Sequence, residues 1–220
     1  MKALPIELQS DLSLDDVHRI FNAGIIAIDC EMAGLNPHRD QLYLVQISDP
    51  NAHANVIKTS NWQQVVNLKK VLLDERIVKV FHFAIMDCAF LQQHLQLTVQ
   101  NPYCTKIASK IARTYSSSHS LKNLVEDLFG QTLDKKNQQS YWGRSNLSRE
   151  QIQYAIQDTH FILSIKKDLE AILDEKGILP TGITYSELNK RCQQFIPTLV
   201  HLWVNGWDFG KETPESIFGR

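Results

Sequence analysis

The chain has 220 residues, of which 43% are hydrophobic and 21% are charged, and its formal net charge is -1 at pH 7. These values are typical of an ordinary globular domain and exclude a disordered, collagen-like or coiled-coil chain. The near-neutral charge also disfavours a protein that holds long nucleic acid by its phosphates, because such proteins usually carry a surplus of Lys and Arg. A nucleic-acid substrate would have to be short, or be held by a local basic patch.

Four cysteines, at positions 30, 88, 104 and 192, lie far apart without a CxxC spacing. This argues against a zinc knuckle or a redox dithiol and favours a reducing compartment. The N-terminal residues turn acidic where a signal peptide would need an apolar core, and no apolar run approaches the roughly 18 residues of a membrane span. We therefore expect a cytoplasmic protein with no membrane partner.

The predicted elements alternate between strands and helices, which indicates an α/β domain. In chain order we expect strands at 25–28, 43–47 and 55–57, a helix over 62–72, a strand at 77–81 and a helix over 84–95. The first three strands are expected to form an antiparallel meander, with a turn at 34–37.

After Pro102 the pattern is wholly helical. Capping-box sequences beginning at Ser148 and Thr184 predict the starts of a long helix and of a last helix, which would end at Gly206. The stretch 177–182 is the expected boundary between a main domain, residues 1–177, and a C-terminal helix and tail, residues 178–220.

Asp29 and Glu31 come at the end of the first predicted strand, and because side chains alternate along a strand, both project from one face. Such a pair of carboxylates at a strand end is a metal-binding arrangement. The alternative is a solvated strand end. The apolar run of residues 25–28 weighs against it, since it places the strand in the interior, where an unpaired carboxylate is costly.

Tyr154 and Asp158 are four residues apart in the long predicted helix, so they lie on one face. That face continues through apolar residues and is expected to pack against the sheet. Asp158 must then be compensated by a cation or by hydrogen-bond donors. A capping or surface aspartate, the alternative, fits poorly with a mid-helix position.

Asp87 follows a predicted buried strand and falls in the first turn of the next helix, where an acid could simply complement the helix dipole. Together, however, the four acids carry four negative charges, which suit two Mg²⁺ or Mn²⁺ ions with oxygen ligands. The reaction that such a pair of ions suits is the in-line attack of water on a phosphodiester. Tyr154 would accept a hydrogen bond from that water and orient it.

These segments resemble the DEDD 3′-5′ exonucleases, which include ribonuclease D and the proofreading domains. Asp29 to Glu31 resembles the first motif, His82 to Asp87 the second and Tyr154 to Asp158 the third. Families with a catalytic histidine place it five residues before the last aspartate, where this chain has Gln153; the tyrosine four residues before is typical of the DEDDy branch. Within that branch, segments 34–48 and 104–115 and the FIPT sequence at 195–198, which a Gly-Trp pair follows, resemble the small bacterial nanoRNases of the C type.

The resemblance implies a ribonuclease-H-like exonuclease fold, two divalent cations held by Asp29, Glu31, Asp87 and Asp158, and a ring-shaped homo-oligomer, an octamer in the characterised relatives. Two positions depart from the family. Tyr141 stands where relatives have an aspartate, which puts any role of that acid in doubt, and Cys30 stands where threonine is usual. Cys30 is expected to point away from the metal face as a small buried hydrophobe.

Substrate contacts are predicted from three groups of residues. Lys106, Lys110 and Arg113 share a helical face and would bind a terminal 5′-phosphate, with Ser118 and His119 as further donors. A solvated basic face is the alternative.

Leu35 is at the position of an apolar wedge beneath the terminal base in short-RNA relatives, although a core leucine is equally compatible with the sequence. His82 and Phe83 would line a base pocket by stacking. The alternative for Phe83 is buried packing.

We therefore expect a metal-dependent 3′-5′ exoribonuclease that converts very short RNA, such as dinucleotides, to nucleoside 5′-monophosphates at the end of RNA decay. One alternative is a broader exonuclease on longer RNA or DNA. A second is a catalytically silent nucleic-acid-binding module on the same fold, and a third is a structural cation site without activity.

Overall fold

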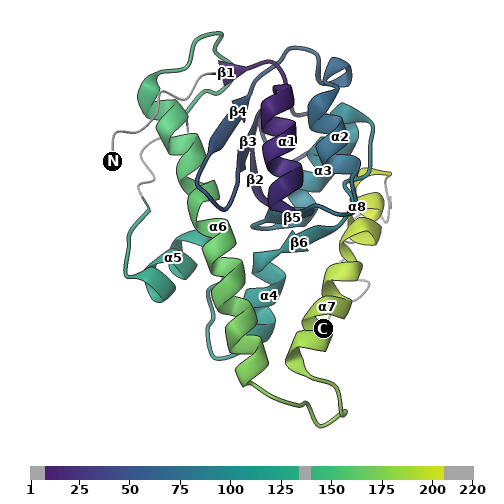
Figure 1. Cartoon of the computed structure of the whole chain (residues 1–220), viewed down its shortest axis with the longest axis vertical. Coiled ribbons are helices and arrows are strands. Elements are labelled where there is room, and N and C mark those ends of the chain that lie inside the picture. The colour runs from purple at the N-terminus through teal and green to yellow at the C-terminus, as the bar shows by residue number, and fades with distance from the viewer. Residues whose placement is uncertain (1–7, 134–139, 206–220) are drawn as a thin grey trace.

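The computed structural model of the chain describes residues 8–133 and 140–205, and a six-stranded mixed sheet forms its centre (Figure 1). The strands are Leu8–Gln9 (β1), Ile25–Met32 (β2), Leu42–Ser48 (β3), Ala54–Ile57 (β4), Val78–Phe81 (β5) and Pro102–Cys104 (β6), in the spatial order β1-β4-β3-β2-β5-β6. The antiparallel pairs β2–β3 and β3–β4 confirm the predicted meander. β5 runs parallel to β2, β6 parallel to β5, and β1 parallel to β4.

Helices cover both faces of this sheet (Figure 1). They are Leu14–Ala23 (α1), Asn67–Leu73 (α2), Ala84–Leu95 (α3), Thr105–Ala112 (α4), Leu121–Phe129 (α5), Arg149–Glu175 (α6), Tyr185–Gln194 (α7) and Ile196–Val204 (α8), with a 3₁₀ turn at Trp62–Gln64 (η1). The predicted α/β class and mixed sheet are confirmed.

The central strand β2 is buried on both faces, as its continuous apolar run predicts. Ile26 and Ile28 belong to the core that α1, α2, α3 and α8 cover. Ala27, between them, belongs to a second core with residues of α4, α5 and α6. Odd-numbered residues of β2 therefore face α6, and this alternation decides which helix Asp29 and Glu31 face.

The long helix α6 begins as its capping box predicts: the Ser148 hydroxyl accepts from the backbone N–H of Gln151, and the Gln151 side chain accepts from the backbone N–H of Ser148. Its buried stripe includes Tyr154, Thr159 and Ile165, and it packs against β2 and β3. The Thr184 hydroxyl likewise caps α7, as predicted. Within residues 8–133 and 140–205, no helix has both the length and the apolar character needed to cross a membrane.

Four features differ from the sequence-based expectations. The segment after Pro102 is not wholly helical, because residues 102–104 form the edge strand β6. Helix α1 and strand β1 were not predicted. The helix expected over 62–72 divides into η1 and α2, because Val65 between them has an extended backbone. The last helix divides at Phe195 into α7 and α8, and Gly206, its expected end, lies outside the described residues.

The C-terminal helices pack onto the same body as the strands. Ile196, Val200 and Val204 of α8 belong to the core that α3 helps to form. The buried amide of Gln193 in α7 accepts a 2.7 Å hydrogen bond from the backbone N–H of Cys104 and donates a 3.1 Å bond to the Cys104 carbonyl. This side chain satisfies backbone groups that the edge strand β6 would otherwise leave unpaired.

Candidate active site

Asp29 and Glu31 project from β2 towards α6. In the β2–β3 register, Ala27 lies opposite Ser48, Asp29 opposite Gln46 and Glu31 opposite Leu44. The hydroxyl oxygen of Ser48 is 2.6 Å from that of Thr159 in α6, which fixes this face of the sheet against the helix. Because strand side chains alternate, both acids lie in the layer between sheet and helix, as predicted.

The negative charges of the four predicted acids act on one another. Burial raises the pKa of Asp29 well above its ordinary value, and the charges of Asp87, Asp158 and Glu31 raise it further. Burial, with the charges of Asp158 and Asp87, raises the pKa of Glu31 to about 8. The structure therefore brings Asp29, Glu31, Asp87 and Asp158 together from β2, α3 and α6.

Asp87 lies in the first turn of α3 and is only 5% exposed. Burial raises the pKa of its carboxyl to about 7, although hydrogen bonds from the backbone N–H groups of Asp87 and Cys30 and from the Cys30 thiol lower it. Cys30 is a buried residue of the core under α1 and α3, as expected. The expectation that it points away from the acids holds for Asp29 and Glu31 and is wrong for Asp87.

Tyr154 and Asp158 share a face of α6, as their spacing predicts. The ring of Tyr154 is 9% exposed and stacks on Trp142, with the ring centroids 6.1 Å apart. Trp142 is itself held by Lys58, whose Nζ donates a 2.7 Å hydrogen bond to the Trp142 carbonyl. Sequence reasoning did not identify Trp142, because the contact joins a loop to the following helix without a periodic pattern.

The chemistry of the four acids fits divalent cations. All four supply hard oxygen donors, they are partly or fully buried, and the charged groups that raise the pKa of Asp29 are all carboxylates. Within residues 8–133 and 140–205, no three His, Cys, Asp or Glu side chains already form a group that could hold an ion. The four acids lie near enough for their negative charges to repel one another, and bound cations would reduce that repulsion.

His82 and Phe83 link the second acidic segment to α4. The ring Nδ1 of His82 is 2.9 Å from the hydroxyl of Thr105, and burial lowers the pKa of His82 to about 4. Phe83 has a left-handed backbone with φ of 78°, a strained conformation for an aromatic residue. The Nζ of Lys106 lies 4.2 Å from the centroid of its half-buried ring. Phe83 is thus half-buried, which leaves both the base-pocket role and the alternative of buried packing open.

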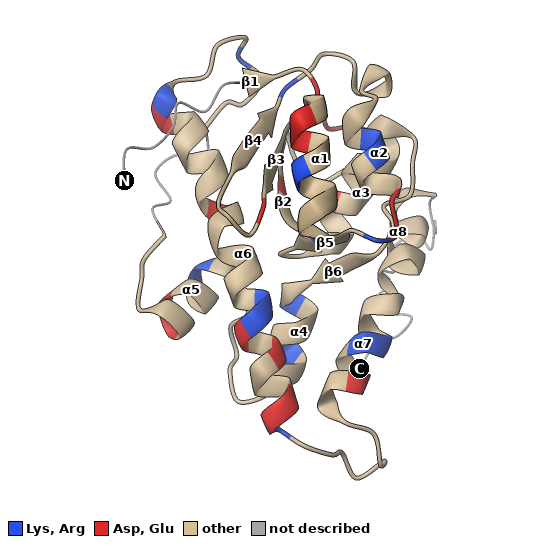
Figure 2. Cartoon of the chain, viewed as in Figure 1, with Lys and Arg blue, Asp and Glu red and all other residues tan. Residues whose placement is uncertain are grey.

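The predicted basic stripe is only partly present. Lys106 and Lys110 lie on α4, where Figure 2 shows basic residues. Arg113 does not join them, because α4 ends at Ala112, and Arg113 is 2% exposed and paired with Asp127 of α5. Ser118 and His119 lie in the loop before α5, and His119 Nδ1 is 2.9 Å from the Ser109 hydroxyl. Arg113 is thus a buried ion-pair residue rather than part of an exposed phosphate site.

Leu35 is 74% exposed in the loop after β2, so the alternative of a core leucine is wrong. Asp40 closes this loop by accepting a 2.9 Å hydrogen bond from the backbone N–H of Asn36. A Cβ at Gly34 would lie 2.2 Å from a carboxylate oxygen of Asp40, so a larger residue there would displace this carboxylate. Tyr141, the departure from the family pattern, is also exposed and lies edge-on to Tyr43 with centroids 6.1 Å apart.

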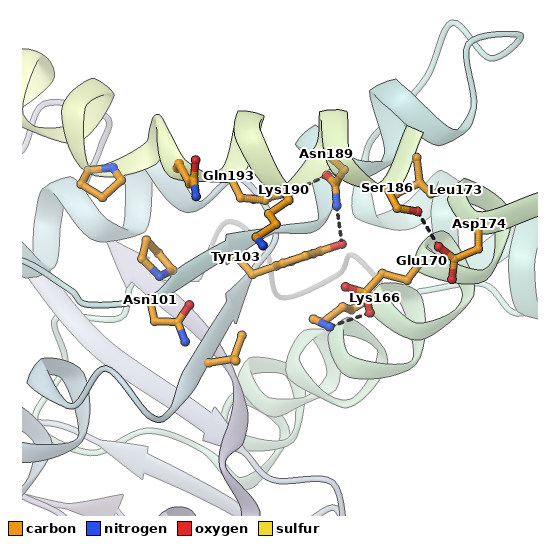
Figure 3. A pocket seen from close by; sticks show the side chains of 14 residues that line it. Asn101, Tyr103, Lys166, Glu170, Leu173, Asp174, Ser186, Asn189, Lys190 and Gln193 are labelled. Carbon is orange, nitrogen blue, oxygen red and sulfur yellow. Dashed lines mark hydrogen bonds and ion pairs between the residues drawn. The ribbon is translucent and has the colours of Figure 1, made fainter. Parts of the chain in front are cut away.

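A separate cavity of about 730 Å³ lies between β6, α6 and α7 (Figure 3). It is lined by none of the four acids. Several of its polar side chains pair with one another: Asn189 donates to the Tyr103 hydroxyl at 3.2 Å, and Lys166 donates to Glu170 at 2.6 Å. Val78, the first residue of β5, lines the cavity and pairs with Ile25 at the start of the parallel strand β2. Asp29 and Glu31 lie further along β2, away from this end of the sheet.

Comparison with known proteins places this arrangement among nucleases. A family model described as 3′-5′ exonuclease matches residues 8–174. The exosome complex exonuclease RRP6 of Saccharomyces cerevisiae is 31% identical over 194 residues, which are 88% of this chain and 26% of that protein. Ribonuclease D of Bartonella henselae is 30% identical over 157 residues, 68% of this chain and 37% of that protein. The chain thus spans less than two fifths of either curated relative.

Two of the solved structures that we compare match over nearly their whole length, and a third matches over about half of its chain. NrnC of Brucella melitensis with bound Mg²⁺ has a TM-score of 0.83 and 34% identity, over 94% of this chain and 96% of that chain. The structure of the same protein bound to pGG has 33% identity and a TM-score of 0.83, over 96% of this chain and 98% of that chain. Escherichia coli RNase D, at 22% identity and a TM-score of 0.70, shows the common fold alone. These findings confirm the resemblance that the three sequence motifs indicate.

Proposed function

Because the chain belongs to the 3′-5′ exonuclease family, we propose that it hydrolyses very short RNA, down to dinucleotides, to nucleoside 5′-monophosphates. It would act in the cytoplasm at the end of RNA decay. The observation that carries the proposal is the electrostatic cluster of Asp29, Glu31, Asp87 and Asp158, which the sheet and two helices bring together. Family membership implies dependence on a divalent metal, and we propose two ions, Mg²⁺ or Mn²⁺.

In this proposal the four carboxylates hold the cations, which supply activation of water and stabilisation of the leaving oxygen when bound. Tyr154 accepts a hydrogen bond from the attacking water and orients it towards the phosphorus. Stacking on Trp142 limits the rotation of the Tyr154 ring and keeps its hydroxyl on the same helical face as Asp158.

The preference for short substrates is supported by the charges around the acids: in the described part of the chain, no Lys or Arg is among the groups that shift the pKa of Asp29, Glu31 or Asp87. Lys106 and Lys110 of α4 would bind the 5′-phosphate, whereas Arg113 is held by Asp127. Exposed Leu35 would support the terminal base as a wedge, and the half-buried ring of Phe83 would stack on a base. A long phosphate backbone would need a broader basic surface.

The test compares kcat/KM for a 5′-phosphorylated dinucleotide and for a strand of roughly twenty nucleotides. We expect much faster turnover of the dinucleotide, and complete loss of turnover when the metal is chelated. Similar values for both substrates would favour the broader exonuclease instead. Binding of RNA without hydrolysis in the presence of Mn²⁺ would favour the catalytically silent module.

We also propose that the protein is a ring-shaped homo-oligomer. The support is its likeness to the small nanoRNases and the exposure of large apolar side chains, including Leu14, Val66 and Leu73 near the start of α1 and on α2. Light scattering should give a mass several times the 25.2 kDa of one chain. A mass of one chain at micromolar concentration would contradict this part of the proposal.

A further inference from the structure

Gln46 lies in the middle of β3 and is completely buried, yet its amide is unpaired. Neither Oε1 nor Nε2 has a hydrogen-bond partner among residues 8–133 and 140–205. Leaving such a buried group unsatisfied destabilises the folded protein. The buried amide of Gln193, by contrast, makes hydrogen bonds to Cys104 and Asn189. The amide of Gln46 is unpaired whereas that of Gln193 is not, so the burial of Gln46 needs an explanation.

The strand register places this amide beside the first acid of the cluster. Gln46 lies directly opposite Asp29 in the antiparallel pair β2–β3. Side chains that face each other in this way lie on the same side of the sheet, with Cβ atoms about 4.5–5.5 Å apart. Gln46 therefore lies under α6, in the same layer as the carboxylate of Asp29.

The other neighbours of Gln46 within the sheet offer it no free hydrogen-bonding group. Val56 on β4 and Leu44 two residues earlier on β3 are apolar and buried. Ser48, two residues later, is engaged with Thr159, and Thr159 donates its own hydrogen to the Ile156 carbonyl at 2.8 Å. Because each hydroxyl has a single hydrogen, Ser48 must donate to Thr159. Asp29 is the polar side chain that faces Gln46 directly.

We propose that Gln46 is a positioning residue for Asp29. When divalent cations occupy the acidic cluster, the Nε2–H group of Gln46 donates a hydrogen bond to the Asp29 carboxylate oxygen that faces β3. This bond holds the carboxylate with its other oxygen towards the ions. A carboxylate has lone pairs beyond those that a cation uses, and donors to the outer side of a ligand typically change metal affinity by about 10–100-fold. The inference rests on the proposed cation chemistry.

The experiment measures Mn²⁺ affinity by calorimetry, and the melting temperature without metal, for the wild type and for Gln46→Leu, Gln46→Met and Gln193→Leu. Gln46→Leu and Gln46→Met should weaken Mn²⁺ binding by about 10–100-fold. Their metal-free melting temperature should not fall, because an unpaired amide is replaced by an apolar group of similar size. Both variants should also lower kcat more than they change KM.

Gln193→Leu is the matched control. It removes an amide whose hydrogen bonds are all made, so it should lower the melting temperature and leave Mn²⁺ affinity unchanged. Unchanged Mn²⁺ affinity in both Gln46 variants would overturn the inference, as would a loss of melting temperature in both as large as in Gln193→Leu. Should Gln46→Leu fail to fold, the more flexible Gln46→Met decides. A wild type that binds no Mn²⁺ would instead contradict the proposed cation site itself.

Discussion

Asp158 of α6 lies close enough to Glu31 of β2 for its negative charge to raise the pKa of the Glu31 carboxyl. The two residues lie far apart in the sequence, and the packing of α6 on β2 brings them together. Buried acids that repel one another are costly to the fold. Their arrangement is explained by the cations that they would hold.

Asp158→Asn should abolish most activity and stabilise the metal-free protein. Loss of a metal ligand should lower activity by at least about 100-fold, because loss of a group that only supports a ligand can already lower it by that much. Removing its charge relieves repulsion on Asp29 and Glu31, so the melting temperature in chelator should rise. Turnover of a dinucleotide and thermal unfolding check the two effects. Retained activity would remove Asp158 from the site.

Tyr154→Phe should lower kcat by about 10²–10⁴-fold, the usual range for a group that orients or exchanges a proton in the reaction. KM and Mn²⁺ affinity should change little, because the ring and its stacking on Trp142 remain. Steady-state kinetics with the dinucleotide and calorimetry with Mn²⁺ measure both. An unaffected kcat would assign Tyr154 a packing role only.

The metal-free protein should lose stability as the pH rises from 6.5 to 8. The folded-state pKa of Glu31 is about 8 and that of Asp87 about 7, both above the ordinary values of 4.5 and 3.8. The folded protein therefore holds protons that the unfolded chain has already released, so the free energy of unfolding falls as these carboxyls ionise. Mn²⁺ should oppose this loss, with a larger rise in melting temperature at pH 8.

Other groups act outside that window. His82, with a pKa lowered to about 4, makes stability rise with pH, but only below its ordinary value of 6.5. Lys79, with a pKa lowered to about 8, also makes stability rise with pH, but chiefly above pH 8. Glu31→Gln is the control and should make the fall in stability between pH 6.5 and 8 smaller, with Asp87 still contributing. A wild-type profile that rises across this window would contradict the described burial of the acids.

Arg113→Ala and Lys110→Ala should separate folding from substrate binding. Arg113 is buried and paired with Asp127, so its loss should lower stability by more than about 1 kcal/mol. Lys110 is exposed on α4, so its loss should leave the melting temperature unchanged and raise KM for a 5′-phosphorylated dinucleotide. The same substrate without the 5′-phosphate should show no such rise. Equal effects of Lys110→Ala on both substrates would exclude a phosphate contact.

The predicted parts of the fold were those with strong local signals. The apolar run before Asp29 and the capping box at Ser148 predict β2 and α6, and the spacing of Tyr154 and Asp158 predicts their common face. Other elements depend on distant contacts. The Asp11 carboxylate accepts from the backbone N–H groups of residues 66, 67 and 68, so the start of α2 is capped from a remote segment.

Local patterns also failed where tertiary structure decides. Residues 102–104 are too few to show strand alternation, and their pairing with β5 makes them a strand. Extending the basic stripe to Arg113 assumed a helix one residue longer than α4. Gln46 could not be assigned from sequence, because its relation to Asp29 exists only through the strand register. By contrast, α1 does carry a local signal, the capping box formed by Ser13 and Asp16.

The most direct test of the acidic cluster is the anomalous diffraction of Mn²⁺ in crystals of the protein. We expect Mn²⁺ peaks within coordination distance of Asp29, Glu31, Asp87 and Asp158, and their loss in crystals of Asp158→Asn. Mn²⁺ bound only elsewhere, in a protein that hydrolyses dinucleotides equally well in chelator, would contradict this expectation.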